Sequence, residues 1–193
     1  MELYDRRREP ASRNELIVGL YAGLGVVAFV IGALRGDWDL YRVAGVSTTW
    51  KLLLSPLVGI ALGLGVVFLT RLSVHRFDWA RRLHRDFRGL LGHLSARDVF
   101  ILAVASSLGE ELLFRGALQP WMGLVPSAVV FALLHIGPGV RFLPWTFMAL
   151  LVGLVFGGIS AWLGDLGAPI AAHFVINFMN LDYITRVELP AES

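Results

Sequence analysis

Long apolar segments recur along the chain, and they constrain its fold more than any other feature. A helix that crosses a bilayer needs about 20 mainly apolar residues. Six candidate segments, two of them short, cover residues 15–34, 50–70, 98–118, 125–137, 143–163 and 169–184. In lipid, backbone polar groups must be satisfied within such segments. We therefore expect an all-α fold, a polytopic transmembrane helical bundle of about six membrane segments.

The overall composition agrees with a membrane protein. Hydrophobic residues make up 56% of the 193 positions and charged residues only 17%, whereas a soluble domain has about 25% charged residues. The length fits a single integral-membrane domain, residues 1–193. Cysteine is absent, which excludes disulfides, thiolate metal ligands and a cysteine nucleophile. No A-x-A-like cleavage site follows the first apolar run, so we expect it to be retained.

The basic residues predict how the chain is oriented. Cytoplasmic loops of membrane proteins carry an excess of lysine and arginine. If the N-terminus is cytoplasmic, only Arg35, Arg42 and Lys51 lie outside, and Arg115 lies within a segment. We expect a multi-pass protein of a bacterial inner membrane with both termini cytoplasmic. The arginines adjoin apolar segments, so the expected partner is the lipid bilayer, and no nucleic acid is expected.

The segment between the second and third candidate spans also has helical periodicity. Apolar side chains recur over residues 77–91 with arginines between them, a pattern typical of a basic amphipathic helix on an anionic membrane surface. A solvated connector is the alternative. We expect the histidines of this region, His75, His84 and His93, to be solvated.

Glycine pairs indicate close helix packing. The spacing G-x-x-x-G lets two helix backbones approach each other. It occurs three times within the apolar segments, at Gly19/Gly23, Gly59/Gly63 and Gly153/Gly157. The pairs favour a compact bundle and carry no information on function.

Six polar residues interrupt the later apolar segments. A charged side chain at the centre of a membrane helix costs on the order of 2.5–3.5 kcal/mol even on the lenient insertion scale. We therefore expect these residues to face one another or a wet cavity. They are Glu110, Glu111, Arg115, His135, His173 and Asn177.

Helical spacing groups these residues further. Glu111 and Arg115 are four positions apart, so they share a helix face and can form an ion pair. His173 and Asn177 have the same spacing and form one polar face. Glu110 is rotated by about 100° from Glu111 and points to a different neighbour.

The chemistry available to this set is hydrolytic. A carboxylate and an imidazole can hold and deprotonate a water molecule, while a second imidazole and a carboxamide stabilise an oxyanion. Alternatively, Glu110, His135 and His173 can ligate zinc and leave a fourth position for water. No serine lies in a nucleophile motif, and we interpret Ser106 and Ser107 as packing residues.

Three motifs on separate segments resemble those of a known family. They read EELLFR at residues 110–115, FALLH at 131–135 and HFVIN at 173–177. In this order they are similar to the motifs of the CPBP intramembrane proteases, the Abi family of type II CAAX-prenyl-endopeptidase-like proteins. The resemblance covers about residues 98–184, the expected catalytic core.

The resemblance implies a role for each motif residue. Glu110 and His135 activate the attacking water, and His173 and Asn177 stabilise the tetrahedral oxyanion. Glu111, paired with Arg115, orients the site. The implied reaction is a glutamate-type hydrolysis without a covalent intermediate and without a cofactor; a zinc-dependent version is the alternative.

The implied activity is that of an intramembrane endopeptidase acting on a membrane-anchored protein or peptide, near its C-terminus. Within the family, the chain is similar in its minimal size to the myxosortases, which process C-terminal sorting signals. Two alternatives from other classes are a non-enzymatic immunity or scaffold protein and a small ion or proton transporter. The complete motif set disfavours the scaffold, and the lack of an inverted repeat disfavours the transporter.

Overall fold

The computed structural model describes residues 13–42 and 49–189, and every regular element in this part is a helix. The all-α prediction is therefore confirmed. The arginines of residues 6–8, which entered the orientation argument, lie outside the described residues. The elements are α1 (Arg13–Leu34), α2 (Thr49–Arg76), α3 (Asp78–Leu91), α4 (Ala96–Glu111), the π-helix η1 (Leu112–Leu118), α5 (Gln119–Met122), α6 (Leu124–Leu133), the 3-10 helix η2 (Val140–Phe142), α7 (Leu143–Leu163) and α8 (Gly167–Arg186).

The chain is a membrane protein whose apolar helices face outward. Three segments are long and apolar enough to cross a bilayer: α1, α2 and residues Val140–Leu163. Large apolar side chains on their outer faces are exposed, among them Leu20, Val26 and Leu53. Such a surface suits lipid, because water would make it an association patch. The remaining segments are shorter or more polar, so the number of six crossings stays a prediction.

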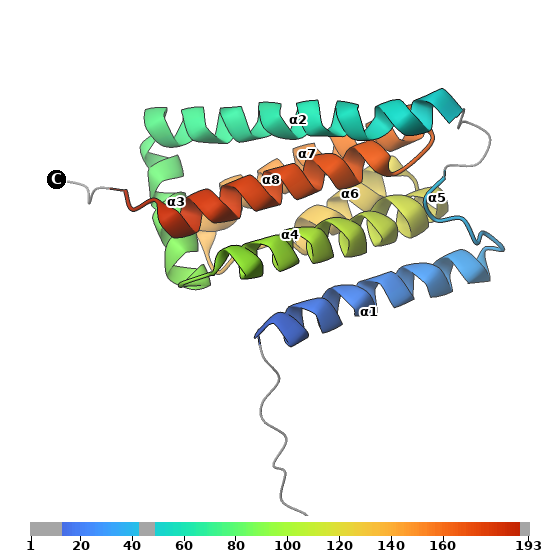
Figure 1. Cartoon of the computed structure of the whole chain (residues 1–193), viewed down its shortest axis with the longest axis horizontal. Helices are drawn as coiled ribbons and strands as arrows, with labels where there is room; N and C mark the ends of the chain where they lie inside the picture. Colours follow the sequence, from blue (N-terminus) through green and yellow to red (C-terminus); the bar gives the residue numbers. More distant parts are fainter. Residues whose placement is uncertain (1–12, 43–48, 190–193) are drawn as a thin grey trace, which may run out of the picture.

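Helix α8 lies at the centre of the bundle, between α2 and α4 (Figure 1). Its closest approach is to α2, where Gly63 packs on the backbone of α8. A Cβ atom at Gly63 would lie 2.9 Å from the carbonyl oxygen of Ala172, and one at Gly59 would overlap Ala168. The predicted close packing is confirmed for this pair. It is wrong for Gly19 and Gly23, which have open space around them.

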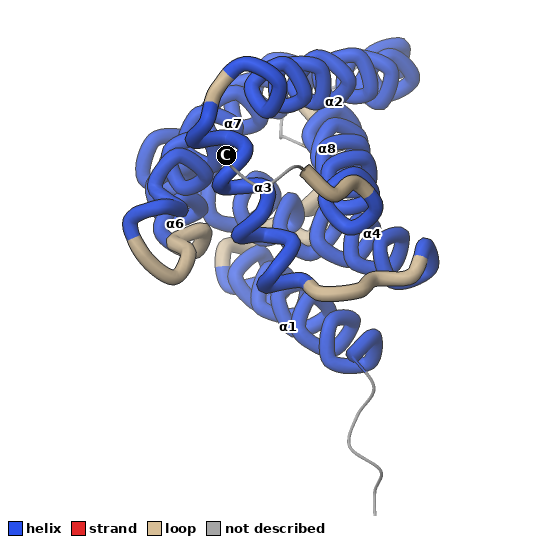
Figure 2. The backbone as a smooth tube through the Cα atoms, turned by 90° about the vertical axis from the view of Figure 1, so that its left-hand side faces the viewer, coloured by secondary structure: helices blue, strands red, loops and turns tan. Residues whose placement is uncertain are grey.

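Helix α3 runs across one end of the bundle, as the end-on view of Figure 2 shows. The helix predicted for this region is confirmed, and its place at a membrane surface stays a prediction. Arg88 ties α3 to the C-terminal end of α8 by donating to the carbonyls of Ile184 and Thr185, at 3.0 and 2.6 Å. A cation at these unsatisfied carbonyls also offsets the negative end of the helix dipole.

The prediction of a solvated His84 is wrong. Its side chain is buried between α3 and the end of α8, where Nε2 donates to the carbonyl of Val187 at 2.9 Å. Its ring also packs edge-on against Tyr183. The many arginines of this segment predicted exposure to water on all sides, whereas one face of α3 packs on α8.

Several segment boundaries also differ from the expected ones. The fourth segment was expected over residues 125–137, but α6 ends at Leu133, so His135 lies in the turn after the helix. The second apolar segment was expected to end at residue 70, but α2 continues to Arg76. Hydropathy marks only the lipid-facing part of a helix, and backbone hydrogen bonds carry it on into the polar region. The third was expected as one straight helix over 98–118, but α4 ends at Glu111 and the chain continues as the π-helix η1.

Candidate active site

The two glutamates lie at the last positions of α4, where the helix changes to π geometry. Ser95 and Asp98 form a capping box that fixes the start of α4. At its other end the hydrogen bonds shift to i→i+5, as from the Gln119 N–H to the Phe114 carbonyl. Short π segments inside helices occur frequently at functional sites. Here the change of winding follows directly after Glu110 and Glu111.

Glu111 joins two helices through one oxygen atom. Its Oε1 accepts from Arg115 Nη1 at 2.9 Å and from His173 Nδ1 at 2.7 Å. The predicted Glu111–Arg115 pair is thus confirmed, and it extends to the histidine of α8. All three side chains are buried, with Glu111 fully inaccessible to solvent. Because a carboxylate accepts, His173 carries its proton on Nδ1.

Arg115 is enclosed by aromatic rings. Its guanidinium carbon lies 4.5 Å from the ring centre of Phe131 and 5.4 Å from that of Phe156. Its Nη2 donates to the carbonyl of Gly153 on α7 at 3.4 Å. Cation–π contacts and charge-assisted bonds are strong where water is excluded. Arg115 is therefore fixed in place and holds the Glu111 carboxylate rigidly.

Glu110 faces both histidines. Its Oε2 lies 3.7 Å from Nε2 of His135 and 3.8 Å from Nε2 of His173. These distances are too long for direct hydrogen bonds, so the two rings face the carboxylate without bonding to it. Oε2 is buried and has no hydrogen-bond partner in the described chain.

The tautomer of His135 follows from its other ring nitrogen. Nδ1 lies 2.7 Å from the carbonyl oxygen of Phe131, and a carbonyl only accepts, so Nδ1 carries the proton. In neutral imidazoles protonated at Nδ1, Nε2 presents a lone pair. Two lone pairs, of His135 and His173, therefore point toward Oε2 of Glu110. A small donor such as water is the group that satisfies such an arrangement.

The spacing of the described side chains does not support the zinc alternative. Among the described side chains, no group of three His, Asp or Glu is spaced to hold a metal ion. The set expected for zinc, Glu110, His135 and His173, does converge, but with the separations given above.

Asn177 lies one turn beyond His173 on α8 and is held from α4. Its Nδ2 donates to Oγ of Ser106 at 2.9 Å, and Ser106 in turn donates to the carbonyl of Ala103 at 3.3 Å. Ser106 was interpreted as a packing residue, so its contact with a motif residue is new. The amide of Asn177 keeps a second N–H for another acceptor.

Side chains from α1 and α7 also contact the site, and the sequence did not predict them. Tyr21 of α1 interacts with the Glu110 carboxylate through its hydroxyl. Trp145 of α7 packs against His135, with ring centres 5.1 Å apart, and Thr146 donates to the His135 carbonyl at 2.8 Å. No pattern in the sequence indicates which distant helix lies beside a given residue, so nothing pointed to them.

Comparison with known proteins finds one family that matches the part of the chain carrying the site. Residues 93–179 match the family described as type II CAAX prenyl endopeptidase Rce1-like. The chain is 34% identical over 82 residues to YpbD of Bacillus subtilis (strain 168), a protein whose function is uncharacterised. The match covers 41% of this chain and 41% of YpbD, so the chain spans about two fifths of that relative's length. No solved structure matches the chain.

Proposed function

We propose that the chain is an intramembrane protease of the glutamate type, because residues 93–179 match the Rce1-like type II CAAX prenyl endopeptidase family. The observation that carries the proposal is the convergence of two histidine Nε2 atoms, at 3.7 and 3.8 Å, on the buried Oε2 of Glu110. That point is buried, and the carboxylate and the two neutral imidazoles around it are hydrogen-bond acceptors, which favours a proton-donating group such as water as their partner in the reaction.

In the proposed reaction Glu110 and His135 hold the water and Glu110 takes its proton. The water oxygen then forms a bond to the carbonyl carbon of the scissile peptide. The C–N bond breaks as the proton passes from Glu110 to the leaving nitrogen. General base and acid catalysis by one carboxylate contributes about 10²–10⁴-fold in enzymes.

His173 and Asn177 are the proposed stabilisers of the tetrahedral oxyanion. Asn177 has one amide N–H left after its bond to Ser106. The neutral ring of His173 accepts at Nε2, so we propose that it donates to the oxyanion in its doubly protonated form, in which Nδ1–H keeps its bond to Glu111. Glu111 and Arg115 act through His173, and we assign them a positioning role.

The proposed mechanism uses no metal and no other cofactor. Glu110 comes from α4, His135 from the turn after α6 and His173 from α8, and among the described residues no three such side chains are spaced to hold a metal ion. Metal analysis of the purified active protein tests this part. Activity that disappears with a chelator and returns with zinc would contradict it.

The proposed substrate is a membrane-anchored protein or peptide that is cut near its C-terminus. The site lies inside a bundle whose outer face is apolar, so the substrate must reach it from the bilayer or from the membrane surface. The arginines of α3 and the positive-inside rule favour a cytoplasmic α3 end. We propose a bacterial inner membrane with both termini cytoplasmic as the setting.

A single isosteric change tests the function. In Glu110→Gln the side chain keeps its shape but cannot act as a base, so cleavage should fall at least 100-fold. The assay uses the full chain in proteoliposomes with a panel of membrane-anchored peptides, and mass spectrometry detects the released C-terminal fragments. Glu188→Gln, which changes an exposed glutamate outside the site, serves as the matched control and should retain activity.

The same experiment separates the protease from a scaffold or immunity protein. A scaffold would work equally well with Glu110→Gln, because it needs no base. Full cleavage by this variant would contradict the assignment of Glu110. Absence of cleavage by the unaltered chain on every peptide of the panel would count against the protease.

A further inference from the structure

A pocket lies at the end of the bundle that α3 crosses, and its lining includes none of the six motif residues. It is an open pocket of about 560 Å³ between α3 and the segment that leads into α7. This volume is within the range of small-ligand sites, roughly 300–1,000 Å³. Its walls are formed by Arg85, Asp86, Gly89 and Leu90 on one side and by residues 138–142 on the other.

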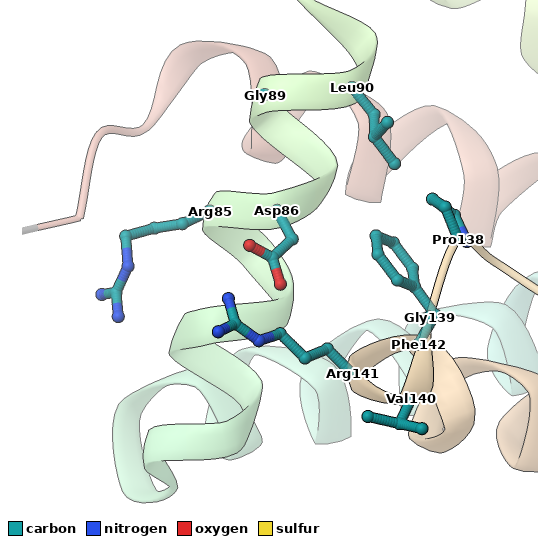
Figure 3. A pocket seen from close by; sticks show the side chains of 9 residues that line it. All are labelled: Arg85, Asp86, Gly89, Leu90, Pro138, Gly139, Val140, Arg141 and Phe142. Atoms are coloured by element: carbon teal, nitrogen blue, oxygen red, sulfur yellow. The ribbon is translucent and has the colours of Figure 1, made fainter.

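The pocket contains one negative and one positive group on opposite walls. Figure 3 shows the Asp86 side chain pointing toward the guanidinium of Arg141, whereas Arg85 extends to the other side of α3. Within the described residues Arg141 makes no hydrogen bond or ion pair. In the same part of the chain, Oδ2 of Asp86 is buried without a hydrogen-bond partner. A buried carboxylate oxygen of this kind calls for a donor.

The pocket also adjoins the apolar surface of the molecule. Val140 is the first residue of the candidate span that runs to Leu163. Its side chain is 79% exposed, and Leu90 and Leu143 are each 57% exposed. Charged groups beside exposed apolar side chains at a span end are suited to the level of lipid headgroups.

We propose that this pocket binds the headgroup of an aminophospholipid. The primary ammonium donates to Asp86, the phosphate accepts from Arg141, and the acyl chains run along Val140 and Leu143. A choline headgroup has no N–H to offer Asp86. A purely anionic headgroup lacks the ammonium and meets the Asp86 carboxylate, so neither satisfies both walls. Lipid binding here does not use the base chemistry of Glu110, so the Glu110→Gln variant should still bind lipid.

Native mass spectrometry of the full chain tests the proposal. The protein is presented with phosphatidylethanolamine, phosphatidylcholine and phosphatidylglycerol of identical acyl chains. We expect the ethanolamine lipid to bind about tenfold more tightly than the choline lipid, the effect of one charge-assisted hydrogen bond. Equal binding of the two, or tightest binding of phosphatidylglycerol, would overturn the proposal.

Variants of Asp86 and Arg141 test which residue recognises the ammonium and which the phosphate. Asp86→Asn should bring the ethanolamine-to-choline ratio close to one. Arg141→Gln should weaken both lipids and leave the ratio unchanged, because both carry the phosphate. Arg97→Gln removes an exposed charge at the start of α4 and should change neither. An unchanged ratio in Asp86→Asn would reject the site.

A ligand series keeps the test decisive if a variant does not fold. Mono- and dimethylated ethanolamine lipids lose N–H donors one at a time while the phosphate and chains stay the same. Their affinity for the unaltered protein should fall stepwise toward that of the choline lipid. A flat series would show that no N–H donor is recognised.

Discussion

The imidazole of His173 and the carboxylate of Glu111 meet across two helices, with Nδ1 and Oε1 2.7 Å apart. They are separated by 62 positions in the chain. The same oxygen accepts from Arg115, so an ion pair on one segment sets the direction of a histidine on another. The other ring nitrogen of His173 is thereby aimed at Glu110.

Replacing Arg115 should destabilise the protein. We expect Arg115→Met to lower the free energy of unfolding by about 3–5 kcal/mol, because it leaves Glu111 charged, buried and uncompensated. Thermal unfolding in detergent measures the effect. Arg97→Met, at an exposed position, is the control and should change stability by less than about 0.5 kcal/mol. Equal stability of the two variants would show that the buried pair has no structural role.

Removing the Ser106 hydroxyl should affect turnover through Asn177. Ser106→Ala removes the hydroxyl oxygen that accepts a hydrogen bond from the Asn177 amide. We expect kcat to fall severalfold, in line with about 0.5–1.5 kcal/mol for one hydrogen bond. KM should stay the same, because the bond positions an oxyanion donor. Ser107→Ala is a neighbouring control, since the Ser107 hydroxyl donates to the Val104 carbonyl of its own helix. Equal kcat values for both variants would remove Ser106 from the site.

Tyr21 should contribute to the position of Glu110. Tyr21→Phe keeps the ring and removes the hydroxyl that interacts with the carboxylate. We expect kcat to fall about tenfold, as for the loss of a hydrogen bond to a charged group, with KM and thermal stability unchanged. Tyr183→Phe removes a hydroxyl at the far end of α8 and leaves the ring under Arg71. If both variants are fully active while Glu110→Gln is inactive, Tyr21 has no part in catalysis.

The docking of α3 should weaken as the pH falls. Burial lowers the pKa of His84, against the opposing effect of its bond to the Val187 carbonyl. The unfolded chain therefore binds the proton more readily than the folded one. Stability from this residue is complete above the unfolded pKa of 6.5 and decreases as the pH falls below it.

Hydrogen exchange of residues 78–91 at pH 7.5 and pH 5.5 measures this effect. We expect faster exchange at the lower pH, after correction for the intrinsic rate. In His84→Gln the amide can still donate to the carbonyl of Val187 but does not titrate, so the pH dependence should disappear. The same dependence in both proteins would place the titrating group elsewhere.

Several features of the fold followed from local sequence patterns. Apolar runs of sufficient length predicted the helices, and the alternation of arginine with apolar residues predicted α3. The spacing of Glu111 and Arg115 predicted their ion pair, because residues four apart share a helix face and need no knowledge of other helices. The motif residues Glu110, His135 and His173 were identified because charged and imidazole groups are conspicuous in apolar segments.

Other features depended on how the helices pack. His84 was expected in water, but its side chain lies under the end of α8. Ser106 and Tyr21 contact the motif residues, but neither position stands out in the hydropathy pattern of its apolar segment. The π segment after Glu111 also has no hydropathy signature, since its residues are as apolar as those of an α-helix.

The sequence by itself determined that the chain is a helical membrane protein and which polar residues must be sheltered from lipid. These properties follow from the transfer energies of single side chains and from spacing within one helix. Only the tertiary structure decided that both histidines turn Nε2 toward Glu110 and that Glu111 orients one of them. Those relationships depend on the rotation and crossing of separate helices, which arise from packing between residues far apart in the chain.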